Sequence, residues 1–176
     1  MAGIDDILKQ LPIDDIASQL GVDRKTAKAA IREGGQTILG GLKKETESPE
    51  GAAALTNALT KHAGDKRISS AADIDTADGL GILGHVFGGE QDQVAQRLGA
   101  SSKKAGGVDF GALLPMLAPI IMNFIANKKD EGGAKADADS GGGLDIGDLL
   151  GGVLGGGSSK GGFDLGGILG GFLGKK

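Results

Sequence analysis

Residues 110–126 read FGALLPMLAPIIMNFIA, a run of 17 residues without a charge. This length lies at the lower edge of what crosses a bilayer as a helix. Pro115, Pro119 and the polar Asn123 weaken a single spanning helix, and no Trp or Tyr flanks it as an interfacial anchor. The run therefore predicts the central helix of a globular core, buried by its neighbours and kinked by its two prolines. We do not expect integral membrane insertion, and peripheral membrane association stays an alternative.

The residues before this run place apolar side chains three and four positions apart, which is the pattern of amphipathic helices. A short helix is expected over residues 4–10, and a second begins at Pro12 and ends at Gly21. Asp23 then caps a third helix. Gly34 and Gly35 interrupt it, and they either permit a close helix crossing or split the helix in two. Its inward residues are Ala27, Ala30, Ile31, Ile38, Leu39 and Leu42.

Similar start and stop signals mark the rest of the core. They predict a helix from Ser48 and Pro49, followed by a loop over residues 61–70. A helix from Asp75 to Gly88 and Gly89 comes next, and then a short helix over 90–98 that Gly99 stops. A linker over 101–107 leads to a cap at Asp109. The predicted fold class is therefore all-α, with a multihelical core over residues 1–127 and a flexible linker over 128–142.

The C-terminal tail, residues 143–176, repeats one motif. Residues 143–155 read GLDIGDLLGGVLG and residues 162–174 read GFDLGGILGGFLG, with eight of thirteen positions identical. Such a glycine content makes folding costly in entropy, while the apolar residues between the glycines favour burial. We expect a disordered or weakly helical tail that binds the protein itself or another protein. The candidate association residues are Leu149, Leu150, Val153, Leu154, Ile168, Leu169, Phe172 and Leu173.

The composition favours a non-catalytic protein. There is no cysteine, which excludes thiolate metal sites and thiol redox chemistry, and the net charge of −4 indicates no particular partner. No arrangement of Ser, His and Asp typical of a hydrolase can be named, and His62 and His85 stand alone without metal-ligand spacing. We expect no enzymatic activity and no cofactor. The first 20 residues carry four aspartates and no long apolar run, so a cytoplasmic protein is expected.

Residues 16–31, IASQLGVDRKTAKAAI, resemble a helix-turn-helix DNA reader. Arg24, Lys28 and Arg32 follow at four-residue spacing and would share one helix face, where phosphates or base edges could be met. Residues 1–44, however, carry seven Lys and Arg against six Asp and Glu. A DNA reader usually has a clear basic face. A DNA-binding regulator is therefore the alternative, a packing hairpin is favoured, and specific nucleic-acid binding is not expected.

Residues 79–84, GLGILG, match the dinucleotide-binding pattern G-x-G-x-x-G. That pattern works after a parallel strand, where its glycines bring a pyrophosphate to a helix start. The preceding residues, SSAADIDTAD, do not read as a buried strand. Nucleotide binding is therefore not expected.

Four segments occur in one order along the chain: IASQLGVD from Ile16, ILGGLKKETESPEGAAAL from Ile38, DGLGILGHVFGG from Asp78 and LLPMLAPIIMNFI from Leu113. With the Gly- and Leu-rich tail behind them, they resemble the bacterial family of unknown function DUF937, related to YidB-like proteins. The resemblance covers about residues 4–126. It implies an all-helical fold and no established enzymatic activity, and it supplies no catalytic residues. The predicted function is that of a non-catalytic interaction or assembly protein.

Overall fold

The computed structural model describes residues 4–62, 68, 70–133 and 150, with the backbone alone for 129–133. Every regular element in this part of the chain is helical, so the predicted all-α class is confirmed. The elements are α1 (Ile4–Gln10), α2 (Ile13–Leu20), α3 (Arg24–Glu45), α4 (Pro49–His62), a 3₁₀ turn η1 (Ala71–Asp73), α5 (Thr76–Val86), α6 (Gln91–Ser101) and α7 (Phe110–Gly133).

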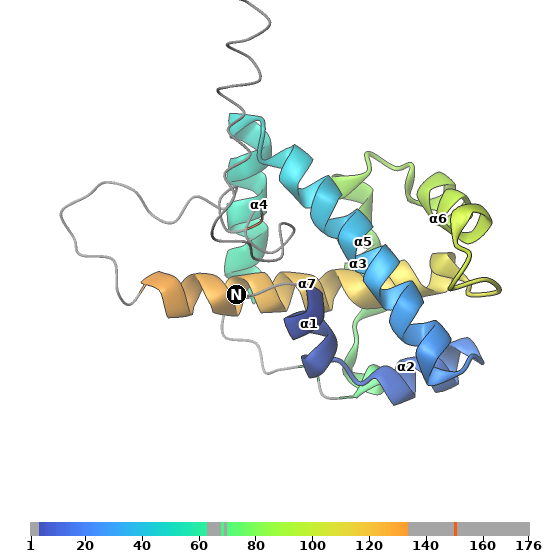
Figure 1. Cartoon of the computed structure of the whole chain (residues 1–176). Coiled ribbons are helices and arrows are strands. Elements are labelled where there is room, and N and C mark those ends of the chain that lie inside the picture. The colour runs from blue at the N-terminus through green and yellow to red at the C-terminus, as the bar shows by residue number, and fades with distance from the viewer. Residues whose placement is uncertain (1–3, 63–67, 69, 134–149, 151–176) are drawn as a thin grey trace, which may run out of the picture.

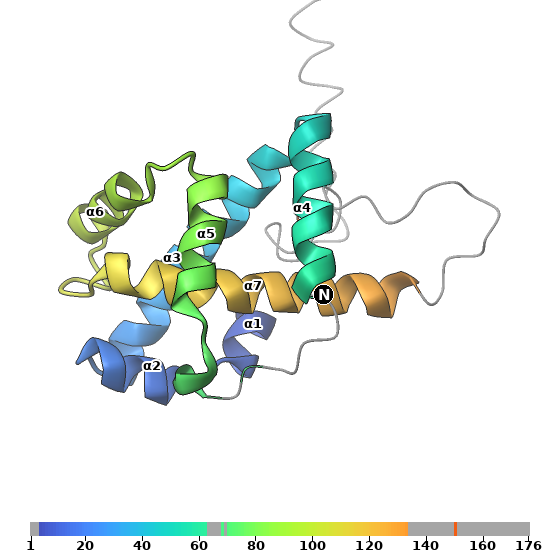
Figure 2. The ribbon, with the colours of Figure 1, turned by 180° about the vertical axis from the view of Figure 1, so that it is seen from behind.

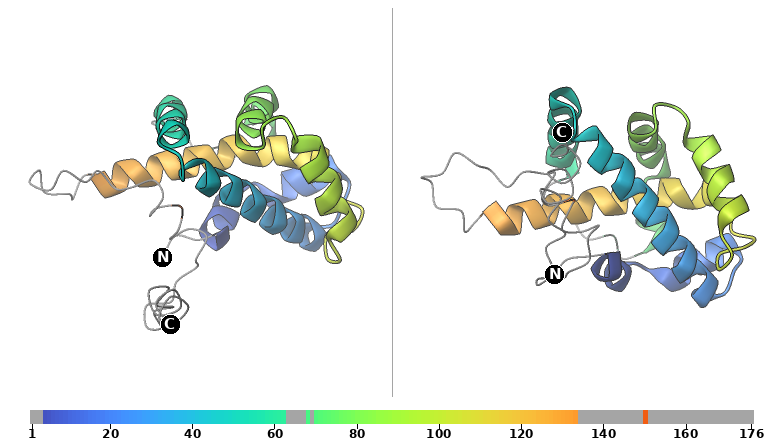
Figure 3. Two further views of the ribbon diagram at one scale, coloured as in Figure 1. Left: turned by 90° about the horizontal axis from the view of Figure 1, so that it is seen from above. Right: turned by 45° about the horizontal axis from the view of Figure 1, so that its top comes forward.

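Helix α7 lies at the centre of the core (Figure 1). Seen from above, α4 and α5 lie on one side of α7 and α3 crosses it on the other (Figure 3). Leu113 and Ile125 of α7 are completely buried, and Leu117 is 1% exposed. Segment Phe110–Lys128 is long and apolar enough to span a membrane, but 83% of its most apolar window is buried among the other helices. The predicted role of this run as a buried central helix is confirmed.

The two prolines do not end α7, which continues through Pro115 and Pro119. Pro119 has no N–H, so it cannot donate the helical hydrogen bond to the carbonyl oxygen of Pro115. Helix α5 approaches at this point: a Cβ added to Gly79 would lie 1.9 Å from that oxygen. The absence of a side chain at Gly79 therefore allows the α5 backbone to pack against α7.

Helix α3 is undivided over 22 residues, so Gly34 and Gly35 mark a close crossing and not a break. A Cβ added to Gly34 would lie 3.1 Å from Leu117 Cδ1 of α7. A Cβ added to Gly35 would lie 2.6 Å from Ile4 Cδ1 of α1. The glycine pair thus forms a notch in α3 that receives side chains from two other helices.

The helix starts are built as their sequences predict. Asp23 and Asp75 each accept hydrogen bonds from the first backbone N–H groups of α3 and α5. The Ser48 hydroxyl accepts from Gly51 N at 3.1 Å, and Asp109 Oδ1 accepts from Gly111 N at 2.8 Å. These side chains satisfy N–H groups that lack a partner within the helix.

Three predicted helix ends are wrong. Helix α4 continues through Lys61 to His62, the first two residues of the predicted loop over residues 61–70. Helix α6 continues through Gly99 to Ser101, because one glycine inside a helix costs only about 1 kcal/mol. Helix α7 continues to Gly133, through residues 128–133 of the predicted linker. The sequence there reads KKDEGG, in which Lys and Glu are good helix formers and the stop signal comes only with the final glycines.

Candidate binding cleft between helices α4 and α5

A cleft of about 340 Å³ lies where α4 and α5 stand side by side on α7. The two helices run in opposite directions, and both pack on α7 (Figure 2). The apolar residues of the cleft are Leu42, Leu55, Ile82, Val86 and Met122, the small ones are Gly51, Ala54, Ala58 and Gly81, and the polar ones are Glu45, Asn57, Lys61, His62, Asp78 and His85. An apolar surface with a few polar groups is typical of a binding site.

Small residues leave the space between the two walls of the cleft open. Ala54 and Ala58 are one turn apart on α4, and Gly81 faces them from α5. A Cβ added to Gly81 would meet no atom within 4 Å, so this glycine borders open space. The notch of α3 differs, because side chains of α1 and α7 fill the space beside its two glycines.

Both histidines of the chain line this cleft. His62 ends α4, and its Nε2 lies 3.5 Å from Asp78 Oδ2 in the first turn of α5. The side chain of His62 is only 15% exposed. His85 Nδ1 lies 3.0 Å from the carbonyl oxygen of Gly81, and this nitrogen donates because a carbonyl oxygen only accepts.

Sequence reasoning missed this pair because the two histidines are 23 residues apart and neither has a ligand motif beside it. His85 falls in the last turn of a predicted helix, but His62 falls in the predicted loop over residues 61–70. The structure instead ends α4 at His62, and α5 follows it in the opposite direction (Figure 2). Antiparallel helices joined in this way bring the end of the first beside the start of the second, which is how His62 meets Asp78.

No metal centre is present in the cleft or elsewhere in the described part of the chain, where no group of three or more His, Asp or Glu side chains could hold an ion. A second hollow of about 420 Å³ lies beside α6 and the start of α7. Its lining includes Asp92, Gln96 and Asp109 together with the apolar Val108 and Phe110.

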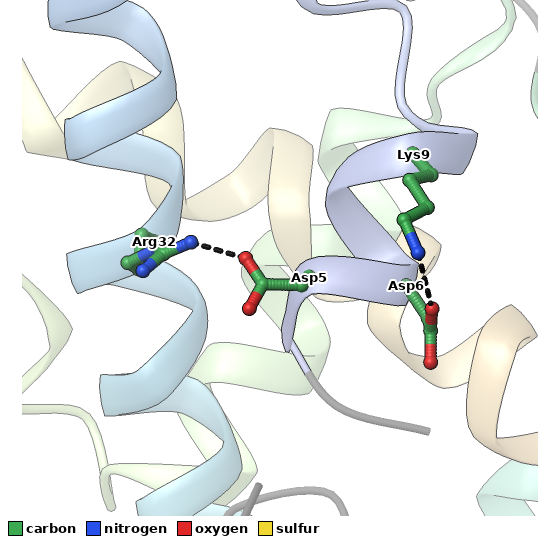
Figure 4. A network of polar contacts seen from close by, with 4 residues as sticks. All are labelled: Asp5, Asp6, Lys9 and Arg32. Atoms are coloured by element: carbon green, nitrogen blue, oxygen red, sulfur yellow. Dashed lines mark hydrogen bonds and ion pairs between the residues drawn. The ribbon is translucent and has the colours of Figure 1, made fainter. Parts of the chain in front are cut away.

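The three predicted DNA-contact residues share the exposed side of α3, but two of them bind aspartates. Arg24 forms an ion pair with Asp14 of α2. Arg32 forms one with Asp5 of α1, beside the Lys9–Asp6 pair (Figure 4). Lys28 is exposed between them. The acidic residues of α1 and α2 therefore offset much of the positive charge on this face.

The glycine pattern of residues 79–84 lies entirely inside α5 and not at a turn between a strand and a helix. Only Gly79 contacts another element closely, at Pro115. Added Cβ atoms on Gly81 and Gly84 would meet nothing within 4 Å. Helix packing accounts for Gly79, and the geometry required for a pyrophosphate site is not formed.

One of the eight candidate association residues lies in the described part of the chain. Leu150 is helical, completely buried and part of the hydrophobic core cluster. The other seven lie outside the described residues, namely Leu149, Val153, Leu154, Ile168, Leu169, Phe172 and Leu173.

Comparison with known proteins supports the sequence resemblance. The family model described as "Bacterial protein of unknown function (DUF937)" matches residues 4–128. No curated protein and no solved structure matches the chain. The matched region extends from the start of α1 to Lys128 in α7 and includes all the residues that line the cleft. The chain therefore belongs to the DUF937 family of bacterial proteins.

Proposed function

We propose that this protein is a non-catalytic interaction or assembly protein of the cytoplasm, which receives an apolar helical segment of a protein partner in the α4/α5 cleft. The observation that carries the proposal is the arrangement of small residues on both walls, Ala54 and Ala58 facing Gly81, over an apolar floor. Proteins that bind amphipathic helices present such grooves, and the bound helix inserts side chains spaced three and four residues apart.

The polar rim suits the same kind of ligand. Lys61, His62 and Asp78 lie at one end of α4 and the start of α5, and His85 lies a turn beyond Gly81. Polar groups at the edge of an apolar contact fix the orientation of a bound segment, while the apolar floor supplies most of the affinity. No cofactor is part of the proposal.

The test is photocrosslinking in cells from a benzophenone side chain placed at Ala54. The control position is Ala53, which is exposed on α4 but does not line the cleft. We expect Ala54, and not Ala53, to crosslink to a protein partner. Gly81→Leu should suppress this crosslink by filling the cleft. Gly84→Leu is the matched control, because Gly84 also borders open space on α5 but lies outside the cleft.

Equal crosslinking from Ala53 and Ala54, or no protein crosslink from Ala54, would contradict the proposal. So would a Gly81→Leu protein that folds as wild type and crosslinks undiminished.

A DNA-binding regulator is the second candidate, and the observation that favours it is the exposed row of Arg24, Lys28 and Arg32 on α3. The ion pairs with Asp14 and Asp5 weigh against it. Titration with duplex genomic fragments at physiological salt separates the two candidates. Selective binding near ~10⁻⁸ M, lost in the double variant Arg24→Ala, Arg32→Ala, would favour the regulator.

A further inference from the structure

We propose that the second repeat of the tail, residues 162–174, is a built-in ligand of the α4/α5 cleft of its own chain. This inference rests on the proposed function of the cleft and deepens it, because a tail that occupies the cleft competes with a partner for the same site.

The first argument is the burial of Leu150. This residue belongs to the first repeat, and it is 0% exposed within the hydrophobic core cluster. The core therefore accepts an apolar anchor from this motif. Leu150 does not line the α4/α5 cleft, so the cleft is available to a second anchor.

The second argument is the sequence of the second repeat. Leu169 stands where the first repeat has Leu150. On a helix, Ile168, Leu169, Phe172 and Leu173 share one side, as residues one, four and five positions apart do. Positions 166, 167, 170 and 171 are glycines, so the other side of such a helix would carry no side chains there. Slim helices approach small residues closely, and the walls of the cleft present Ala54, Ala58 and Gly81.

The third argument is the charge at one edge of the cleft. The second repeat carries one carboxylate, Asp164, ahead of Ile168, Leu169, Phe172 and Leu173. The charged groups of the cleft are the carboxylates of Glu45 and Asp78 and the ammonium group of Lys61 on α4, so only the edge at Lys61 attracts Asp164. An ion pair at this edge would orient the docked segment and leave its apolar side chains over the floor of the cleft.

The tether favours the chain's own cleft over that of another copy. Residues 151–161 join the buried Leu150 to the second repeat. A short tether that can reach the site gives an effective concentration in the millimolar range, well above the micromolar concentrations at which separate molecules usually meet. Occupation within one chain is therefore the outcome that the connection favours.

The experiment uses the purified full-length protein with the benzophenone at Ala54, in an equal mixture of ¹⁴N- and ¹⁵N-labelled chains. We expect a crosslink from position 54 to residues 162–174 that joins only like-labelled segments, with the same yield from 1 to 100 μM, two values chosen for the test. Leu169→Asp should lower the yield about 10- to 100-fold, because burial of the leucine is lost. Ser159→Asp, in the spacer between the repeats, should leave it unchanged.

Crosslinks between differently labelled chains, crosslinks to other residues, or no crosslink in the purified protein would overturn the inference. The proposed function is judged separately by the partner crosslinks in cells. If the tail competes with the partner for the cleft, Leu169→Asp increases the partner crosslinks. If Leu169→Asp leaves the partner crosslinks unchanged, the tail is not the competitor, while the cleft is still the binding site.

Discussion

Gly79 shows how one missing side chain fixes the distance between two helices. We expect Gly79→Ala to lower the free energy of unfolding by about 1–3 kcal/mol, because its Cβ would overlap the carbonyl oxygen of Pro115 and the backbones would have to separate. The matched control is Gly84→Ala on the same helix, where no atom lies within 4 Å. That variant should gain up to about 1 kcal/mol from helix propensity. Urea denaturation of both variants measures the difference, and equal stability would contradict the packing described.

Asp23 makes the start of α3 sensitive to pH. The hydrogen bond donated by the Thr26 hydroxyl, with others from the backbone, lowers the pKa of the Asp23 carboxyl below its usual value of 3.8. A carboxyl with a lowered pKa in the folded state stabilises it at pH values above 3.8. That contribution is lost as the pH falls through the folded-state pKa.

The variant Asp23→Asn tests this dependence, since asparagine keeps the capping oxygen but does not titrate. We expect its melting temperature to fall less than that of the wild type between pH 4 and pH 2, the range chosen for the scan. Parallel melting curves for the two proteins across this range would show that the cap does not contribute to acid sensitivity.

Among the elements, α7 contributes the most buried apolar residues. Leu117→Asp should unfold the domain, because an unpaired charge in the core costs several kcal/mol, comparable with the whole stability of a domain. Leu80→Asp on α5 is the control, since Leu80 is 50% exposed and its replacement should leave the fold intact. Circular dichroism and urea denaturation distinguish the two. A folded Leu117→Asp protein would mean that α7 is not the centre of the core.

Helix starts were predictable from sequence and helix contacts were not. Asp23, Ser48, Asp75 and Asp109 act on backbone groups two or three residues away, so a local pattern is enough to identify them. The role of Gly34 depends on Leu117 and that of Gly35 on Ile4, and because both contacts are distant in sequence they could not be predicted from the local pattern. The same holds for the cleft, because nothing near His62 or His85 indicates that α4 and α5 lie side by side.

For the whole molecule, the buried Leu150 connects the tail to the core. We expect Leu150→Ala to lower the free energy of unfolding by about 2–5 kcal/mol, the usual cost of truncating a buried leucine. The matched control is Leu169→Ala at the equivalent position of the second repeat, whose proposed contact with the cleft is reversible, so this variant should affect global stability less. Urea denaturation of the two full-length variants provides the comparison. An equal loss from both would mean that the two repeats contribute alike to the core.

The central position of α7 also has a consequence for how the protein is made. Helix α7 comes last among the core helices, yet α3, α4, α5 and α6 all pack on it. At the usual synthesis rate of about 5–20 residues per second, roughly 5–20 s separate the emergence of α1 from that of α7. During that interval the nascent chain exposes apolar faces that have no partner. We therefore expect the nascent chain to be a client of ribosome-bound chaperones.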